Sequence, residues 1–236
     1  MDIKKKLLKI AGKDDFELDP SISSGYVIRL CWKYGWMKVR GMLLLMKNRG
    51  IARDVFVGKS VKLIEKDQIK IGQKTKIHDN VKIDALSQKG VQIGHHVVIG
   101  EGTIIECTGS LEHVGKGVEI GDRSTFGASC YFGAAGGIRI GDDVVAGQYV
   151  RFHSENHNYD DLNTLIREQG VTHKGIIIGD NCWIGAGAVF LDGAELGAGC
   201  VVGANAVVTR SFEENSVIGG IPARLIKKRD SKTSNE

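Results

Sequence analysis

Large apolar residues recur at every sixth position along most of this chain. The stretch from Ile71 reads IGQKTK IHDNVK ID, and the stretch from Ile178 reads IGDNCW IGAGAV FLDGAE LGAGCV VGANAV VT. A small residue usually follows the large apolar one, and another small or branched residue lies four positions further on. A period of six matches neither the 3.6-residue period of an amphipathic helix nor the alternation of a half-buried strand.

Hexapeptide periodicity is typical of a parallel β-helix. Each hexad supplies a short strand and a turn, and three hexads, about 18 residues, complete one triangular coil. The large apolar residues are expected to fill the interior, with Gly, Asn and Asp at corners that need a positive φ. We expect an all-β β-helix over 51–210, a helical segment at 1–50, and a C-terminal extension with a frayed tail at 211–236.

Three stretches interrupt the repeat and are expected to leave the prism as loops: Ala85–Gln92, Cys107–Glu119 and His153–Gly175. The longest begins within FHSENHNYDD, where His153 and His157 stand four residues apart. Loops held by a rigid scaffold commonly carry function. These histidines are therefore candidates for metal binding or acid–base chemistry, with ordinary loop residues as the plain alternative.

The segment before the repeat has its own composition. From Ser21 to Gly50 it holds six basic residues and no acidic one. Because solenoid ends need covering, it is expected to form a helix that caps the open end of the prism. A basic amphipathic helix with Trp32 and Trp36 would also suit an anionic membrane surface. One helix could serve both purposes, so both interpretations stay open.

Composition narrows the classes of protein. The chain has 32 glycines and only 2 prolines, which indicates tight turns in ordered structure. Its five cysteines show no CxxC or CxxH spacing, so no zinc motif appears, and free thiols in a reducing compartment are expected. A formal net charge of +4 is too small to argue for nucleic acid. No apolar run approaches the ~20 residues that cross a bilayer.

The C-terminal part, IGDNCWIGAGAV to GGIPARLIKK, resembles the hexapeptide-repeat acetyltransferases. It is most similar to the galactoside, maltose and capsule or lipopolysaccharide O-acetyltransferase branch. The Trp-Ile-Gly within a hexad, the VVT-basic run and the GIPAR ending carry the likeness, which extends back to about Val57. The resemblance implies a left-handed β-helix, a homotrimer, and acetyl-CoA as acyl donor in a groove between subunits, with no metal required.

The same resemblance implies the site residues. It places the catalytic histidine at the Asn156-His157 pair, where His157 would take the proton of the attacking hydroxyl. Glu168 is the first candidate to orient that imidazole, with Asp160 and Asp161 behind it. The Ala186 N–H would stabilise the developing oxyanion. The implied donor-binding residues are Trp183, Gly185, Ala186, Gly203, Ala204, Thr209, Arg210 and Arg224, with Lys227 or Lys228 as further phosphate contacts.

The acceptor side departs from the galactoside branch, because the positions of its sugar-binding Asn and Asp fall on Gly127 and Ala135. Candidate acceptor contacts are Ser129, Tyr131, His153 and Asn156. We therefore expect transfer of an acetyl group to a sugar hydroxyl, on a surface polysaccharide or its precursor. We expect a cytoplasmic protein, with peripheral contact to the inner, anionic face of the membrane through 21–50.

Three other functions stay open. An N-acetyltransferase acting on a nucleotide-linked amino sugar is the first, although such relatives usually carry an α/β domain for which 1–50 is too short. A carbonic-anhydrase-like zinc protein would need three neutral imidazoles, drawn from His95, His96, His113, His153 and His157. A non-catalytic trimeric scaffold is the third.

Overall fold

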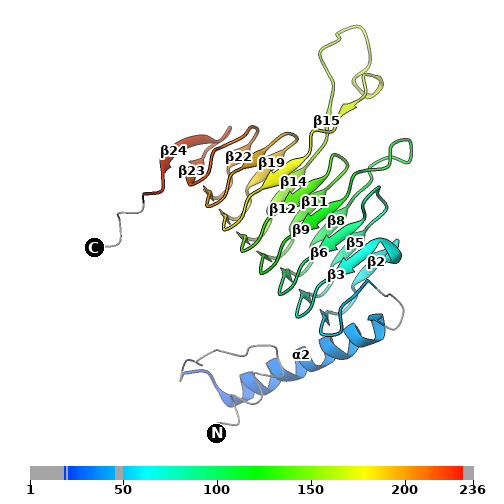
Figure 1. Cartoon of the computed structure of the whole chain (residues 1–236), viewed down its shortest axis with the longest axis vertical. Helices are drawn as coiled ribbons and strands as arrows, with labels where there is room; N and C mark the ends of the chain where they lie inside the picture. Colours follow the sequence, from blue (N-terminus) through cyan, green and yellow to red (C-terminus); the bar gives the residue numbers. More distant parts are fainter. Residues whose placement is uncertain (1–18, 20, 46–49, 231–236) are drawn as a thin grey trace.

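The chain winds into a left-handed parallel β-helix (Figure 1). The hexad period indicates the parallel β-helix, and the family resemblance implies its left hand. The computed structural model describes residue 19, residues 21–45 and residues 50–230. Strands one coil apart pair in parallel and in register, as in Phe56↔Lys76 and Ile71↔Ile93. The basic residues Lys47 and Arg49 and the tail from 231 lie outside the described residues.

Three parallel sheets form the faces of the prism, here called faces A, B and C. Face A consists of β3 (Ile69–Ile71), β6 (Val91–Ile93), β9 (Val118–Ile120), β12 (Ile138–Ile140), β17 (Ile176–Ile178) and β20 (Glu195–Leu196). Face B consists of β1 (Phe56–Val57), β4 (Lys76–Ile77), β7 (Val98–Ile99), β10 (Thr125–Phe126), β13 (Val145–Ala146), β18 (Trp183–Ile184), β21 (Val201–Val202) and β23 (Ser216–Gly219), followed by antiparallel β24 (Arg224–Lys228). Face C consists of β2 (Lys62–Ile64), β5 (Lys82–Asp84), β8 (Ile104–Glu106), β11 (Tyr131–Gly133), β14 (Arg151–His153), β19 (Val189–Leu191) and β22 (Val207–Val208).

The interior consists of stacked rows of like side chains, because successive coils repeat the same hexad. Under face C the rings of Phe132, Phe152 and Phe190 stack with centroids 4.9 and 5.0 Å apart. All three side chains are fully buried. Burying a side chain of this size contributes about 1.5–3 kcal/mol, so the regular rows are the main source of stability.

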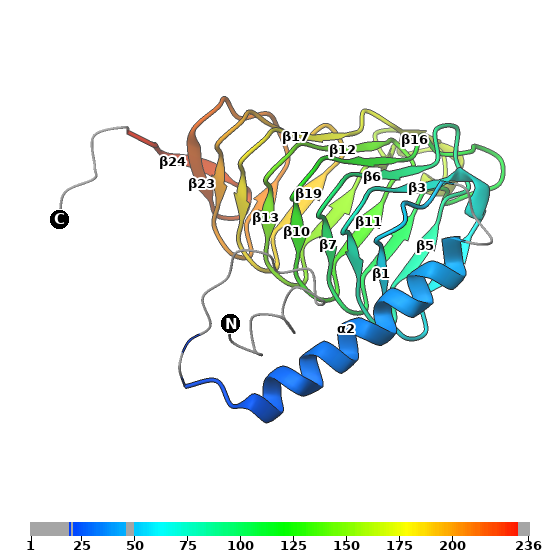
Figure 2. The same cartoon turned by 60° about the horizontal axis from the view of Figure 1, so that its bottom comes forward.

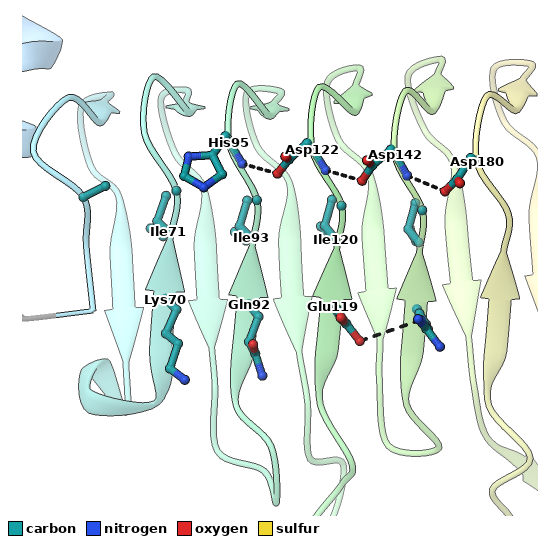
Figure 3. Close-up of a pocket in the computed structure, with 17 residues that line it drawn as sticks. Lys70, Ile71, Gln92, Ile93, His95, Glu119, Ile120, Asp122, Asp142 and Asp180 are labelled. Atoms are coloured by element: carbon teal, nitrogen blue, oxygen red, sulfur yellow. Dashed lines mark hydrogen bonds and ion pairs between the residues drawn. The ribbon is translucent and has the colours of Figure 1, made fainter.

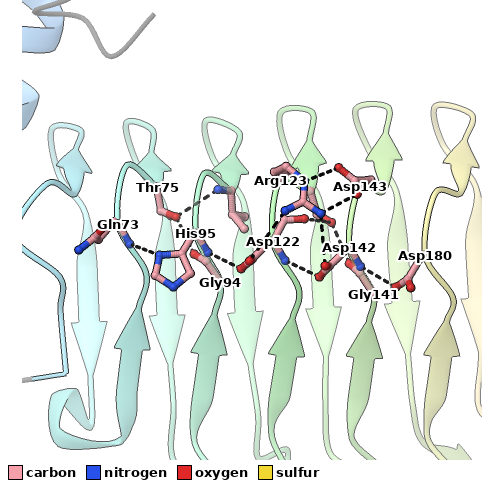
Figure 4. Close-up of polar contacts among 12 residues, drawn as sticks. Gln73, Thr75, Gly94, His95, Asp122, Arg123, Gly141, Asp142, Asp143 and Asp180 are labelled. Carbon is pink, nitrogen blue, oxygen red and sulfur yellow. Dashed lines mark hydrogen bonds and ion pairs between the residues drawn. The ribbon is translucent and has the colours of Figure 1, made fainter. Parts of the chain in front are cut away.

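The Asp of each IGD motif joins neighbouring coils at the edge between faces A and B. Asp122 Oδ1 accepts the N–H of His95 at 2.7 Å, Asp142 Oδ1 that of Asp122 at 2.8 Å, and Asp180 Oδ1 that of Asp142 at 2.8 Å (Figure 3). Arg123 adds a two-pronged contact to Asp143, with both N···O distances 2.7 Å (Figure 4). The Asp residues along this edge therefore satisfy backbone donors of the fold.

The positive φ expected at corner Gly, Asn and Asp residues is found, for example at Gly187 and Asn205. The glycines of the Ile-Gly pairs do not have a positive φ; that conformation falls two residues later, at positions such as Lys74, Arg123 and Asn181. Each such glycine instead lies against the next coil: a Cβ on Gly179 would lie 2.6 Å from the N of Ala198. Glycine is needed there because coils approach closely, and the φ requirement explains only other positions, such as Gly102 and Gly187.

All three interruptions leave the prism at one edge, between faces C and A. They occupy 85–90 between β5 and β6, 107–117 between β8 and β9, and 154–175 between β14 and β17. Figure 1 shows the longest as an arm that projects from the body at the label β15. Any chemistry carried by these loops is thereby gathered along a single edge.

Helix α2 (Ser24–Leu45) packs against the first coil of the prism (Figure 2). Met37 is fully buried and Leu44 packs against the hydrophobic core. Arg40 Nε donates to the carbonyl of Val57 at 2.8 Å, and Lys38 Nζ lies 3.0 Å from Asp54. The helix therefore covers the N-terminal end of the β-helix, one of the two roles expected for it. None of the described helices is long and apolar enough to cross a membrane.

Candidate active site

The arm at 154–175 places His157 on a two-stranded stem. β15 (Asn156–His157) pairs antiparallel with β16 (Val171–Thr172), with Asn156 opposite Thr172 and His157 opposite Val171. The stem continues through the Asn158 N–H, which donates to the Gly170 carbonyl at 3.0 Å. The His157 side chain is exposed. A backbone ladder thus holds this imidazole away from the prism, where a group from outside the chain can reach it.

The base of the stem is tied to the prism by Asp192, which is only 6% exposed. Its carboxylate accepts the N–H groups of Lys174 at 3.0 Å and Gly175 at 2.7 Å, and the Thr172 hydroxyl at 3.1 Å. The repeat pattern did not point to Asp192. An acidic residue inside the apolar run FLDGAE was the available signal, because a buried carboxylate needs donors.

The carboxylate–histidine pair of the arm involves residues other than the expected ones. His173 Nε2 lies 2.6 Å from Glu155 Oε2, at the base of the stem. Glu168 lies in the 3-10 helix η2 (Ile166–Glu168), where its carboxylate is 3.8 Å from Arg167 Nε. Within the described part of the chain, no hydrogen bond joins Glu168 to His157. The repeat pattern did not point to Glu155 or His173 either, because their pairing depends on the antiparallel stem.

Asp161, a second-line candidate to orient His157, has a local structural role. Its carboxylate accepts the Thr164 hydroxyl at 2.6 Å and the Asn163 N–H at 2.9 Å. The hydroxyl hydrogen bond and the backbone hydrogen bond lower the pKa of this carboxyl. Asp161 therefore shapes the turn of the arm, and Asp160 beside it is exposed.

Two of the expected acceptor contacts meet in a small pocket of about 150 Å³ on the outside of face C. The Tyr131 and His153 rings lie 5.4 Å apart, and the Tyr131 hydroxyl donates to Glu106 Oε2 at 3.2 Å. Glu155 and Ala135 also line this pocket. Asn156 follows on the stem, whereas Ser129 lies at the opposite edge of face C, in the corner between β10 and β11.

Burial and neighbouring charged groups together set the charge states in this pocket. Desolvation, followed by the nearby Arg151, lowers the pKa of His153, so its imidazole is neutral near pH 7. A hydrogen bond from Lys82, 2.7 Å away, lowers the pKa of Glu106 and keeps it ionised. Burial and then Glu106 raise the pKa of Tyr131, which keeps the phenol protonated. The pocket therefore offers a neutral imidazole, a phenol and carboxylates, a set suited to hydroxyl groups.

The expected donor-binding residues fall into two groups. Trp183 points outward from face B and is 59% exposed, and the corner that follows it leads from face B to face C. Gly185 and Ala186 stack there against Ala204 and Gly203 of the next coil: a Cβ on Gly185 would lie 2.5 Å from the N of Ala204. Close stacking of coils is thus sufficient to require small residues at this corner.

The basic residues lie elsewhere. Thr209 and Arg210 follow β22 at the edge between faces C and A, where the Arg210 guanidinium lies 5.2 Å from the centre of the Phe212 ring. Arg224 is exposed at the start of β24, opposite Gly219. The structure therefore brings Trp183, Gly185 and Ala186 together but leaves Arg210 on the other side of face C.

His157 and Ala186 do not meet within one chain. The arm leaves the prism at one end of strand β14, and the corner with Ala186 lies at the other end of its neighbour β19. Face C lies between them, with strands of three residues that span about 10 Å. Within the described residues, no group of three or more His, Cys, Asp or Glu is arranged to hold a metal ion.

Comparisons with known proteins find families that are defined by the same hexapeptide repeat. A family described as bacterial transferase hexapeptide (six repeats) matches residues 175–210, and one described as hexapeptide repeat of succinyl-transferase matches 117–148. An inferred acetyltransferase of Dictyostelium discoideum is 35% identical over 149 residues, which cover 63% of this chain and 76% of that protein.

Two further curated relatives share shorter parts. The inferred lipopolysaccharide biosynthesis O-acetyl transferase WbbJ of Escherichia coli is 45% identical over 60 residues, 25% of this chain and 31% of WbbJ. The inferred acetyltransferase Rv3034c of Mycobacterium tuberculosis is 31% identical over 150 residues, 56% of this chain and 50% of its own length. The chain thus spans about half, or less, of the length of these two relatives.

Among solved structures, the fold is shared with a point mutant of AntD, an N-acyltransferase from Bacillus cereus whose crystal structure is a complex with dTDP and coenzyme A. The likeness has a TM-score of 0.50 and 19% identity, and covers 76% of this chain and 84% of AntD. At this identity the comparison supports the architecture alone.

Proposed function

Because the chain belongs to the family of hexapeptide-repeat transferases, we propose that it is an acetyl-CoA-dependent O-acetyltransferase acting on a sugar hydroxyl. The observation that carries this proposal is the exposed His157, held on a backbone stem beside a pocket suited to hydroxyl groups. The curated relatives named as acetyltransferases support acetyl-CoA as the donor. The likeness to WbbJ supports a surface polysaccharide, or its precursor, as the acceptor.

In the proposed reaction, the imidazole of His157 removes the proton from the acceptor hydroxyl as that oxygen attacks the thioester carbonyl. The carbonyl oxygen gains negative charge, which the Ala186 N–H stabilises by a hydrogen bond. The carbon–sulfur bond then breaks, and coenzyme A leaves as a thiol by taking the proton from His157. The acetyl group ends on the acceptor oxygen. Glu168 stays a proposed orienting group, although it makes no hydrogen bond to His157 in the conformation described above.

The separation of His157 from Ala186 supports a homotrimer as the active species. Each site would take its base from the arm of one copy and its oxyanion donor and donor groove from the next copy. In this arrangement Trp183, Gly185, Ala186, Gly203 and Ala204 would line the pantetheine. Thr209, Arg210 and Arg224 would contact the phosphates, since guanidinium groups pair well with them.

We place the acceptor at the pocket formed by Tyr131, His153 and Glu106, beside the stem residue Asn156. A carboxylate accepts hydrogen bonds from sugar hydroxyls, and a phenol can donate to them as well as accept from them. Ser129 lies away from this pocket, so it would contact an acceptor only from a neighbouring copy. An acceptor linked to a lipid would be met at the inner face of the cytoplasmic membrane.

Glu106 and Glu155 give one reason to keep a second function. Carboxylates at the pocket wall would also attract an amino group, as on a nucleotide-linked amino sugar. The chain would then be an N-acetyltransferase with the same donor and the same base. Competition between hydroxyl and amino acceptors at a fixed acetyl-CoA concentration separates the two functions.

Calorimetric binding of acetyl-CoA to the purified full chain tests the proposal without knowledge of the acceptor. We expect saturable binding with one site per chain in the assembled trimer. Arg210→Ala and Arg224→Ala should weaken it, whereas Arg139→Ala, on face A and paired with Glu119 at 3.8 Å, should not. A folded trimer that takes up no acetyl-CoA would rule out the acyltransferase proposal.

A further inference from the structure

Helix α2 has two apolar faces on opposite sides. One side holds the buried Val27, Cys31 and Met37. The other holds five large apolar residues that are 43% to 69% exposed, here called the outer stripe: Ile28, Trp32, Trp36, Val39 and Leu43. At about 100° per residue these five fall within an arc of roughly 80°. The prism covers only one side of α2, so the outer stripe has no role in the β-helix.

Positive charge borders the outer stripe. Arg29, Lys33 and Arg40 follow one flank of α2, and Lys59 approaches from the neighbouring corner of the prism. Together with Trp32 and Trp36 these four residues line a groove of about 450 Å³. Its one acidic member, Asp79, already accepts the Lys59 N–H at 2.7 Å. The groove is therefore aromatic, basic and open to an anion.

The charge state of the nearby His78 agrees with the positive potential that these basic residues create. Burial and then the positive charge of Lys33 lower the pKa of His78, so the imidazole is neutral near pH 7. Across the helix, Lys38 is matched by Asp54 at 3.0 Å. The excess positive charge thus lies on the flank that also carries the two tryptophans.

We propose that the outer stripe of α2 docks on an anionic phospholipid surface. Trp32 and Trp36 would lie at the boundary between headgroups and acyl chains, which tryptophan prefers. Arg29, Lys33, Arg40 and Lys59 would contact lipid phosphates. A contiguous exposed apolar surface of this kind commonly marks an interaction site. A second copy of the chain fits less well, because pairing two stripes brings two basic flanks together.

Vesicle co-sedimentation of the full chain tests this docking. We expect binding to phosphatidylcholine vesicles that contain phosphatidylglycerol, little binding to phosphatidylcholine alone, and release by salt. Trp32→Ser with Trp36→Ser should lower the partition coefficient by about tenfold or more. Arg29→Gln with Lys33→Gln should lower it by about tenfold to thirtyfold, and should reduce its salt dependence. Because two of the three tryptophans lie on the stripe, brominated lipid should quench the emission.

Matched variants keep the test specific. Leu111→Ser, at a side chain 83% exposed in the loop at 107–117, and Lys70→Gln, exposed on face A, should leave vesicle binding unchanged. Circular dichroism and thermal melting check that each variant folds. No binding to anionic vesicles at low salt, or equal binding by the tryptophan double variant, would overturn the proposal.

Light scattering of the same samples without vesicles tests the alternative that the outer stripe contacts a second copy of the chain. A lower assembly mass for the tryptophan double variant would identify the outer stripe as a contact between copies, and the lipid proposal would fail. None of these measurements uses an acetyl donor or acceptor, so their outcome is independent of the proposed function.

Discussion

Two edges of this β-helix differ in how much the lengths of their connections vary. At the edge between faces B and C, every corner has four residues: 58–61, 78–81, 100–103, 127–130, 147–150, 185–188 and 203–206. At the edge between faces C and A, the connections range from three residues at 192–194 to 22 residues at 154–175. The length of the connections is therefore constant at the edge between faces B and C and variable at the edge between faces C and A.

The difference shows that close contact between successive coils limits the length of a corner. Corner residues at the uniform edge lie against the next coil, as Gly147 does against Ala186, where an added Cβ would lie 2.7 Å from the backbone N. A longer corner there would push coils apart. At the variable edge the loops leave the prism, and Gly109, in one of them, has no neighbouring atom within 4 Å of an added Cβ. The proposed base His157 therefore lies at the edge that has this structural freedom, whereas the proposed oxyanion donor Ala186 lies at the uniform edge.

The largest expected effect is at the variable edge. His157→Ala should lower acetyl transfer by about 10²- to 10⁴-fold, the usual loss when a general base is removed. Binding of acetyl-CoA should stay nearly intact, because the imidazole acts on the acceptor hydroxyl. Steady-state kinetics and calorimetry measure the two effects, and His113→Ala, at an exposed histidine on the same edge, is the control. Full activity of the His157 variant would remove this residue from the mechanism.

The next effect is at the uniform edge. Gly185→Val should destabilise the protein by about 1–3 kcal/mol, because the new side chain meets the backbone of Ala204. Gly109→Val, which enters open space at the variable edge, should change stability by less than about 0.5 kcal/mol. Urea unfolding measures both. Equal destabilisation by the two substitutions would contradict the contrast between the edges.

Asp192 connects the arm to the prism, so its loss should act locally. Asp192→Ala leaves three donors of the stem base without their acceptor, which costs about 1–3 kcal/mol. Hydrogen exchange should rise in 171–175 and transfer activity should fall, while the strands of the prism stay protected. Asp67→Asn, at an exposed position on the same edge, serves as the control. Uniformly faster exchange throughout the prism would show that the arm and the prism unfold together.

The smallest effect concerns pH. The pKa of His153 in the folded chain is lowered, mainly by burial, from its ordinary value of 6.5. The unfolded chain therefore binds more protons as the pH falls below about 6.5, and stability is lost in that range. The melting temperature of the wild type should fall more steeply between neutral and mildly acidic pH than that of His153→Gln. Parallel curves would show that His153 titrates normally.

Much of this architecture follows from local pattern. The hexad rows predicted the buried positions correctly, from Ile71 and Ile77 to Phe190 and Val208, because each strand is short and each coil repeats the last. The interruption at 153–175 was likewise visible as a break in the period. The pattern did not explain why glycine follows so many of the large apolar residues, since the closeness of the next coil is not a property of a single hexad.

The arrangement of the candidate site depended on contacts between distant segments. Glu155 pairs with His173, and Tyr131 with Glu106, across 18 and 25 positions of the chain. Spacing along the sequence carries no information on such pairs, because the length of an excursion does not determine where it returns. The catalytic, donor and acceptor assignments therefore stay predictions, to be tested as above.

The sequence by itself determined the period, the inward-facing residues and the position of each excursion, because these depend on side-chain size over six residues at a time. Only the tertiary structure decided that the excursions share one edge, that Asp192 holds the arm, and that α2 covers the first coil while its tryptophans stay exposed. Those features arise from the winding of the chain, which brings residues a coil or more apart into contact.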